Sequence, residues 1–199
     1  MTITSSGIKI QKYSPNLGAI ITGVDLSKEI NENQFKDIHK AFLDNQVLFF
    51  QNQNEILPEA HLKLGKLFGE LHVHPAAPSM PGHPEIFEIH AHKNSKVANG
   101  EFWHSDVSCD IEPPLGTMLQ LHILPATGGD TMFSDMYSAY NELSDKYKIL
   151  LDGLIAIHES EHLYSGRYED RGVNRDNIKT PIAKHPLIRT HPVTGKKAI

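Results

Sequence analysis

Apolar and polar residues alternate along Ile8–Tyr13 near the N-terminus, and this period of two is typical of a half-buried strand. Gly18–Val24, which is bounded by glycines, predicts a second strand. Asn33–Asp44 then repeats apolar residues three to four positions apart, which predicts an amphipathic helix. The apolar run Gln46–Phe50 predicts a further, buried strand. This region therefore mixes strands with a helix.

A second helix is predicted after Pro58, because proline fits the first helical turn, where its missing N–H group loses no hydrogen bond. Apolar residues recur along this helix at three- to four-residue spacing, and Gly69 is expected to end it. A proline-rich loop and a predicted strand at Glu85–His90 follow. The polar stretch 93–100 has no period and indicates a loop that leads to Glu101–Asp106, where the candidate chemistry lies.

The second half of the chain alternates predicted strands with predicted helices. Strands are expected at Thr117–Ile123, Asp130–Ser134, Ile155–His158 and His185–Pro192, and helices at Met136–Leu143 and Ser144–Leu154. A tight turn at Val193–Gly195 leads to Lys197–Ile199, which resembles the start of another strand. The charged stretch 159–180 has few apolar residues and predicts a mobile active-site loop. Many short strands with few helices predict an α+β protein built on a sandwich or barrel-like core.

Length and composition narrow the class of protein. A chain of 199 residues suits one domain with its own core, and 39% hydrophobic residues predict that it folds. The formal net charge of −5 argues against nonspecific nucleic-acid binding, which requires a basic face. No stretch approaches the ~20 apolar residues of a membrane span, and the first residues lack the pattern of a signal peptide. Cys109 is the only cysteine and is expected to be a buried thiol, so a cytoplasmic protein is predicted.

His104 and Asp106 stand two positions apart, beside the only tryptophan, Trp103. Residues i and i+2 of an extended strand point to the same face, so this imidazole and this carboxylate can bind one metal ion together. A His-x-Asp pair with a distant second histidine is the facial triad of non-haem Fe(II) oxygenases. The pair alone is a weak signal, because a hydrogen-bonded surface pair has the same spacing.

Further short motifs accompany this pair in a fixed order along the chain. They are Gly23–Leu26, Phe68–Pro75, Trp103–Val107, Pro113–Pro114, Leu124–Thr131, Tyr140–Ser144 and His185–Gly195. Together they resemble the taurine/2-oxoglutarate dioxygenase (TauD/TfdA) family. The resemblance implies a jelly-roll (double-stranded β-helix) core with flanking helices, Fe(II) as the metal, 2-oxoglutarate as the co-substrate, and O2. The implied reaction hydroxylates a small anionic molecule (a sulfonate, sulfate ester or carboxylate) and releases succinate and CO2.

The same resemblance implies roles for individual residues. His104 and Asp106 match two iron ligands, and Thr131 matches a threonine whose hydroxyl binds a carboxylate of 2-oxoglutarate. His74 matches a histidine that contacts the substrate, and Tyr164 falls where the family has an aromatic residue of the substrate pocket. The family resemblance also implies a homo-oligomer. The charge and the lack of a long apolar stretch predict neither nucleic acid nor a membrane as a partner.

The chain departs from the family pattern at its C-terminal side. The family's second iron-binding histidine and its 2-oxoglutarate-binding arginine lie beyond the last residues of this chain, so the C-terminal part of the jelly roll is absent from it. We interpret residues 1–199 as one dioxygenase domain that is truncated there. Neither His185 nor His191 is expected to replace the missing ligand, because the family keeps that segment for structure.

Other departures concern the substrate. Ala77 and Gly100 stand where taurine-specific members carry a tyrosine and an asparagine, although Asn99 adjoins the second position. Taurine is therefore not the expected substrate. His72 competes with His74 as the substrate contact. The alternatives to a dioxygenase are a non-catalytic binding protein that retains the fold without a complete iron site, and a zinc hydrolase, for which no general base is evident.

Overall fold

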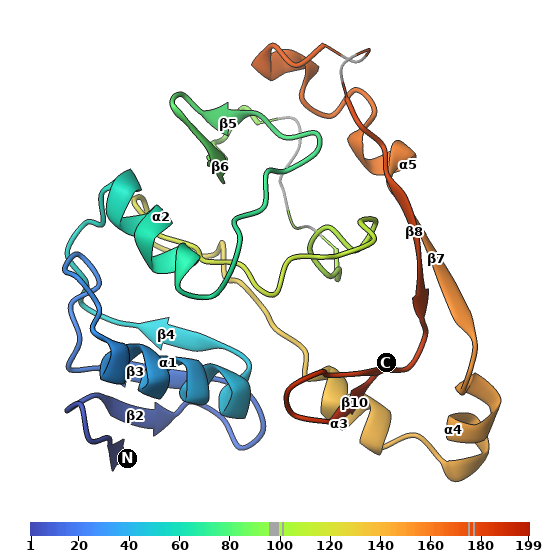
Figure 1. Ribbon diagram of the computed structural model, residues 1–199. Coiled ribbons are helices and arrows are strands. Elements are labelled where there is room, and N and C mark those ends of the chain that lie inside the picture. Colours follow the sequence, from blue (N-terminus) through green and yellow to red (C-terminus); the bar gives the residue numbers. More distant parts are fainter. Residues whose placement is uncertain (96–99, 101, 175, 177) are drawn as a thin grey trace. The chain divides into compact units, whose positions relative to one another are not determined.

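The structure is a computed structural model that describes residues 1–95, 100, 102–174, 176 and 178–199 (Figure 1). Asn99 lies outside the described residues. The chain forms two compact units. The first comprises Met1–Gly69, Leu119–Gly153 and Leu187–Ile199, and the second comprises Glu70–Met118 and Leu154–Pro186. The chain passes between the units at four points, so neither is a contiguous sequence domain. The single dioxygenase domain over residues 1–199 stays a prediction.

The first unit contains a four-stranded sheet in the order β1-β2-β3-β4. Its strands are β1 (Thr2–Ile3), β2 (Lys9–Lys12), β3 (Ala19–Thr22) and β4 (Leu48–Phe50). β3 and β4 are parallel, whereas the other pairs are antiparallel. A parallel pair needs a crossover, and helix α1 (Glu32–Asn45) provides it (Figure 1). The predicted N-terminal strands and helix are confirmed.

Local sequence signals explain where the two helices that share a core with this sheet begin. At the start of α1, the side chains of Asn31 and Gln34 each accept the other's backbone N–H, at 3.0 and 3.1 Å, which is a capping box. Helix α2 (Pro58–Lys66) begins at the proline, as predicted, and ends before Gly69. Ile21 of β3, Ile38 of α1 and Leu64 of α2 meet in one buried core.

The predicted strands Thr117–Ile123 and Asp130–Ser134 are wrong, because the structure assigns neither segment to a strand. Leu121, Ile123 and Met132 expose 71%, 81% and 72% of their surface. A strand requires a neighbour that receives its backbone hydrogen bonds, and no described strand pairs with these segments. The apolar alternation is present, but nothing in the described part of the chain covers it.

Two helices and a hairpin complete the first unit. They are α3 (Met136–Asn141), α4 (Asp145–Leu151), β9 (Arg189–Thr190) and β10 (Lys197–Ala198). Asp135 caps α3 and Ser144 caps α4, each by accepting a backbone N–H of the first turn. Both helices and the turn at Val193–Gly195 confirm the prediction. The predicted strand His185–Pro192 is instead divided between two strands. Residues 185–186 end a strand of the second unit, and Arg189–Thr190 form β9.

The second unit contains two separate antiparallel pairs, β5–β6 and β7–β8 (Figure 1). The strands are β5 (Ser79–Met80), β6 (His83–Phe87), β7 (Ile155–Glu159) and β8 (Ile182–Pro186). β6 ends before the predicted His90, and β7 confirms the predicted strand. Helix α5 (Glu161–Tyr164) and the 3-10 helix η1 (Glu169–Arg171) lie within the stretch 159–180, whose mobility stays a prediction. Among the described residues, no helix combines the length and apolar character needed to cross a bilayer.

Candidate metal and substrate site

The imidazole of His104 and the carboxylate of Asp106 contact each other in the second unit, with 3.1 Å between Nε2 and Oδ1. The opposite ring nitrogen, Nδ1, lies 2.7 Å from the backbone carbonyl of Phe102. A carbonyl only accepts, so Nδ1 carries the hydrogen, and in the neutral ring Nε2 presents its lone pair to Asp106. No strand is assigned here, so the extended strand expected to align the pair is wrong, although the two side chains still meet.

The donor set fits a divalent metal ion. Nε2 of a neutral His104 and Oδ1 of Asp106 are both acceptors, and a cation between them satisfies both. Adjacent octahedral ligands with bonds of about 2.1 Å lie about 3.0 Å apart, which matches the observed separation. Each side chain exposes about half of its surface, 54% and 51%, so the position is accessible. Within the described residues, no group of three or more His, Cys, Asp and Glu side chains could hold a metal ion, so the role of His104 and Asp106 as metal ligands stays a prediction.

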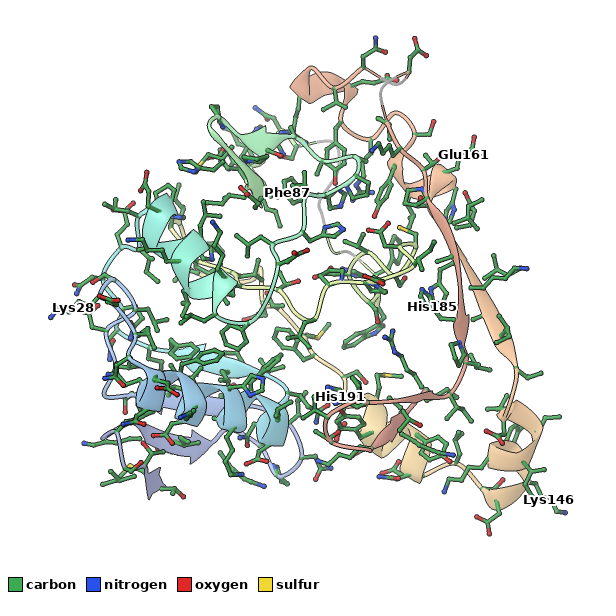
Figure 2. The ribbon with its side chains drawn as sticks, in the orientation of Figure 1. Lys28, Phe87, Lys146, Glu161, His185 and His191 are labelled. Carbon is green, nitrogen blue, oxygen red and sulfur yellow. The ribbon has the colours of Figure 1, made fainter. Side chains whose placement is uncertain are left out.

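A strained turn follows Asp106 directly. Val107 has a φ of 48°, which is unfavourable for a β-branched residue and indicates stored strain. Nδ1 of His158 on β7 lies 2.9 Å from the Ser108 hydroxyl. Nε2 of His185 on β8, which Figure 2 labels, donates to the backbone carbonyls of Ser108 and Asp110, at 3.0 and 2.9 Å. The β7–β8 pair therefore holds the turn that carries the candidate metal ligand.

His72 takes part in the same arrangement. Its Nε2 lies 2.6 Å from Oδ2 of Asp110, and both side chains are about three-quarters covered. This contact gives His72 a structural partner and leaves His74 as the better candidate for a substrate contact. His185 is likewise engaged with the turn, and His191 accepts the backbone N–H groups of Val193 and Thr194 in the first unit.

His74 has a fixed tautomer. Its Nδ1 accepts the backbone N–H groups of Ala76 and Ala77, at 3.1 and 2.8 Å, so in the neutral ring the hydrogen sits on Nε2. Burial lowers the pKa of this imidazole below its ordinary value, and His72 lowers it further, whereas the carboxylates of Asp106 and Asp110 oppose the shift. His74 is therefore a neutral hydrogen-bond donor whose pKa responds to the nearby carboxylate of Asp106.

Tyr164 packs beside His74 in an aromatic cluster of the second unit. The two rings are 5.2 Å apart in an edge-on arrangement. The ring of Phe87 on β6, which Figure 2 labels, lies 5.6 Å from the His74 ring. Burial raises the pKa of the Tyr164 hydroxyl, as does its contact with Cys109, whose sulfur lies 3.7 Å away. Tyr164 therefore remains a protonated phenol, and Cys109 is the buried free thiol that the sequence predicts.

Thr131 is the one predicted site residue in the first unit. It is exposed in an irregular segment, just after Gly128 and Gly129, whose φ values of 77° and 74° form the turn. Its role in binding 2-oxoglutarate stays a prediction. The other four, His74, His104, Asp106 and Tyr164, all belong to the second unit.

Sequence patterns missed several contacts around the pair. Thr117 donates its hydroxyl hydrogen to Oδ2 of Asp106 at 2.6 Å. His158 and His185 reach the turn from 50 and 77 positions away. A period or a short motif carries no signal for contacts over such separations.

Comparison with known proteins identifies the class to which this fold and site belong. Residues 9–199 match the model of the family described as "Taurine catabolism dioxygenase TauD, TfdA family". The chain belongs to this family.

Individual relatives support the assignment. An alkylsulfatase of Acinetobacter baylyi is 32% identical over 199 residues, which cover 96% of this chain and 62% of the relative. An alpha-ketoglutarate-dependent sulfate ester dioxygenase of Pseudomonas putida is 28% identical over 96% of this chain and 65% of its own length. The crystal structure of a taurine dioxygenase from Burkholderia xenovorans has a TM-score of 0.72 at 28% identity, over 96% of this chain and 61% of that one. The chain thus spans less than two-thirds of the length of these relatives.

Proposed function

We propose that the protein carrying this chain is an Fe(II)- and 2-oxoglutarate-dependent dioxygenase. It hydroxylates a small anionic organic substrate and converts 2-oxoglutarate and O2 into succinate and CO2. The observation that carries this proposal is the 3.1 Å approach of His104 Nε2 to Asp106 Oδ1, within a chain of the TauD/TfdA family. The names of the Acinetobacter and Pseudomonas relatives favour a sulfate ester over a carboxylate as the substrate.

His104 and Asp106 would hold the iron through Nε2 and Oδ1. The bound metal, with 2-oxoglutarate and O2, supplies the oxidising power that hydroxylates a C–H bond. A third ligand and an arginine for 2-oxoglutarate would come from the part of the relatives' length that this chain does not span. The same part would complete a jelly roll, and the exposed Leu121, Ile123 and Met132 offer it apolar surface.

The remaining site residues bind and orient the reactants. Nε2–H of His74 would donate to an anionic oxygen of the substrate, and Tyr164 would line the pocket beside it. Thr131 would donate its hydroxyl hydrogen to a carboxylate of 2-oxoglutarate. The stretch 159–180 would exclude water from the reacting centre, where correct orientation of the target carbon matters most.

The substrate would differ from taurine. Ala77 is buried against the aromatic cluster with only 8% exposed, so this position offers no tyrosine hydroxyl to a sulfonate. Gly100 has a φ of 83°, a conformation that favours glycine over a longer polar residue.

The test is spectroscopic and chemical. Anaerobic addition of Fe(II) and 2-oxoglutarate to the natural protein should produce the weak visible charge-transfer band of the chelate. Admission of O2 should then release succinate, fastest with one member of a panel of sulfate esters, sulfonates and carboxylates. A protein that shows neither the band nor succinate would contradict the proposal.

A second candidate is a non-catalytic binding protein with the same fold. The observation that favours it is that no three His, Cys, Asp or Glu side chains of the described residues come together to hold a metal ion. It predicts binding of an anionic ligand, measurable by calorimetry, without any dependence on Fe(II). A requirement for Fe(II) would exclude it.

We also propose a cytoplasmic, homo-oligomeric protein. The buried free thiol of Cys109 is compatible with a reducing compartment. Oligomerisation follows the family resemblance alone, and sedimentation of the purified natural protein would test it.

A further inference from the structure

Thr117 contacts the candidate metal ligand from eleven positions away in the chain. Its Oγ1 donates to Oδ2 of Asp106 at 2.6 Å, and both residues lie in the second unit. This is a short distance, typical of a hydroxyl that donates to an ionised carboxylate. No other hydrogen bond of the Thr117 hydroxyl occurs among the described residues, so Asp106 is its dedicated partner there.

The two oxygens of Asp106 therefore have different surroundings. Oδ1 faces Nε2 of His104 at 3.1 Å, whereas Oδ2 accepts from Thr117. A carboxylate with both oxygens free can bind a metal through one or both of them. A hydroxyl that occupies Oδ2 favours binding through Oδ1 alone and fixes the rotation of the carboxylate.

We propose that Thr117 is a positioning residue of the metal site, which holds Oδ2 so that Asp106 binds the metal through Oδ1 only. This inference rests on the proposed function, since it assumes a metal between His104 and Asp106. Binding through one oxygen leaves one more coordination position for the co-substrate and O2 than binding through two. Partners of this kind orient the ligands of a metal and typically change its affinity 10- to 100-fold.

The backbone around Asp106 is fixed separately from its carboxylate, which leaves a role for Thr117. The strained Val107 turn, fixed through Ser108 and Asp110, sets the main chain on one side of the ligand. The main chain does not set the rotation of the carboxylate, and Asp106 is half exposed. Thr117, which follows Pro113–Pro114 in the chain, supplies that missing restraint through its hydrogen bond to Oδ2.

Two variants separate the hydroxyl from the shape of the side chain. Thr117→Val keeps the shape and removes the hydroxyl, whereas Thr117→Ser keeps the hydroxyl. Thr190→Val, at an exposed threonine of β9 in the first unit, is the matched control for the same chemical change. The probe is Mn(II), a redox-stable substitute for Fe(II), and the free ion is quantified by its electron paramagnetic resonance signal in titrations of the natural protein.

The expected dissociation constant for Mn(II) is 10- to 100-fold higher in Thr117→Val than in the wild type. In Thr117→Ser and Thr190→Val it should stay within about threefold of the wild-type value. The midpoint of thermal unfolding in EDTA should be the same for all four proteins, because Thr117 is exposed.

The outcomes distinguish the inference from the proposed function. A wild-type protein that does not bind Mn(II) would refute the metal site and, with it, both proposals. Equal affinity of the wild type and Thr117→Val would overturn only the inference about Thr117. The inference would also be overturned by a Thr117→Ser variant as weak as Thr117→Val, because the hydroxyl would then not account for the affinity. A Thr117→Val variant that loses stability in EDTA would overturn it too, because the weaker affinity would then follow from a damaged fold.

Discussion

The backbone N–H of Ala77 donates to Nδ1 of His74 at 2.8 Å, and this one contact decides which ring nitrogen of His74 can face a substrate. With the N–H of Ala76 adding a second bond at 3.1 Å, Nδ1 is fully used as an acceptor. Nε2 therefore carries the hydrogen of the neutral ring. A neutral donor recognises an anionic oxygen without the charge of an imidazolium.

The first prediction separates the two nitrogens of His74. In His74→Asn the amide oxygen can replace Nδ1 as the acceptor for the N–H groups of Ala76 and Ala77. The shorter side chain leaves no donor at the position that Nε2 occupies in the wild type. The KM for the anionic substrate should rise 10- to 100-fold, because a hydrogen bond to a charged group contributes about 1.5–3 kcal/mol. Steady-state kinetics at saturating 2-oxoglutarate measure this effect.

His74→Gln is the matched control, since its amide nitrogen can replace Nε2 while no acceptor remains at Nδ1. It should keep the KM closer to the wild-type value and lower the thermal midpoint, because the N–H groups of Ala76 and Ala77 lose their partner. Equal KM values for the two variants would show that His74 does not touch the substrate.

The second prediction concerns pH. Burial, with a further contribution from His72, lowers the pKa of His74 in the folded protein, so the unfolded chain takes up the proton first as the pH falls. The stability that neutral His74 contributes is complete above the ordinary value of about 6.5 and is lost as the pH falls through the folded pKa. Protonation would also place a hydrogen on Nδ1, against the N–H groups of Ala76 and Ala77.

Substrate affinity should accordingly be constant between about pH 7 and 8 and should not improve below the ordinary histidine pKa of about 6.5. Isothermal titration with substrate across this range, in wild type and His74→Asn, measures it. Affinity that rises on acidification in the wild type alone would show that the imidazolium is the binding form.

The third prediction concerns the turn after Asp106. His185→Ala removes the donor for the carbonyls of Ser108 and Asp110, and it should lower the free energy of unfolding by about 1–3 kcal/mol. Val107, at a φ of 48°, should then relax and displace the adjacent ligand, so metal affinity should fall as well. Urea unfolding and a Mn(II) titration measure the two effects.

His185→Gln is the control, because its amide can still donate from a similar position. It should recover part of both losses. If His185→Ala lost stability but kept full metal affinity, the turn would be shown not to position Asp106.

Local signals predicted the parts of the fold that depend on local interactions. α1 follows from its apolar period and from the capping pair Asn31 and Gln34, which act over three positions. The strands expected at Thr117–Ile123 and Asp130–Ser134 required a partner, and alternation of side chains does not show whether a partner is present. Whether a strand finds a pairing partner depends on the fold of the whole chain. Periodicity therefore predicts a strand even where no neighbouring strand is present to pair with it.

In the candidate site, too, residues close together in the sequence could be predicted, whereas contacts between distant residues could not. His104 and Asp106 were recognisable because they are two positions apart within a family motif. The partners that orient them lie far away, as His185 does at 77 positions from Ser108. Such contacts are set by the packing of β7 and β8 and have no fixed spacing to search for.

The fourth prediction tests the ligand itself. Asp106→Asn keeps the shape of the side chain, and its amide oxygen can still accept from Thr117, so the fold around it should be retained. The amide has no charge and is a much weaker ligand for a divalent first-row metal than a carboxylate. Affinity for Mn(II) should fall by more than about 100-fold, while the thermal midpoint in EDTA changes little, since Asp106 is half exposed.

Asp106→Glu completes this test, because it keeps the charge and moves the carboxylate by one methylene group. It should bind Mn(II) more tightly than Asp106→Asn and less tightly than the wild type, since Thr117 and His104 are placed for the shorter side chain. Full Mn(II) affinity in Asp106→Asn would show that the 3.1 Å contact with His104 is an ordinary ion pair on the surface and that the metal, if any, binds elsewhere.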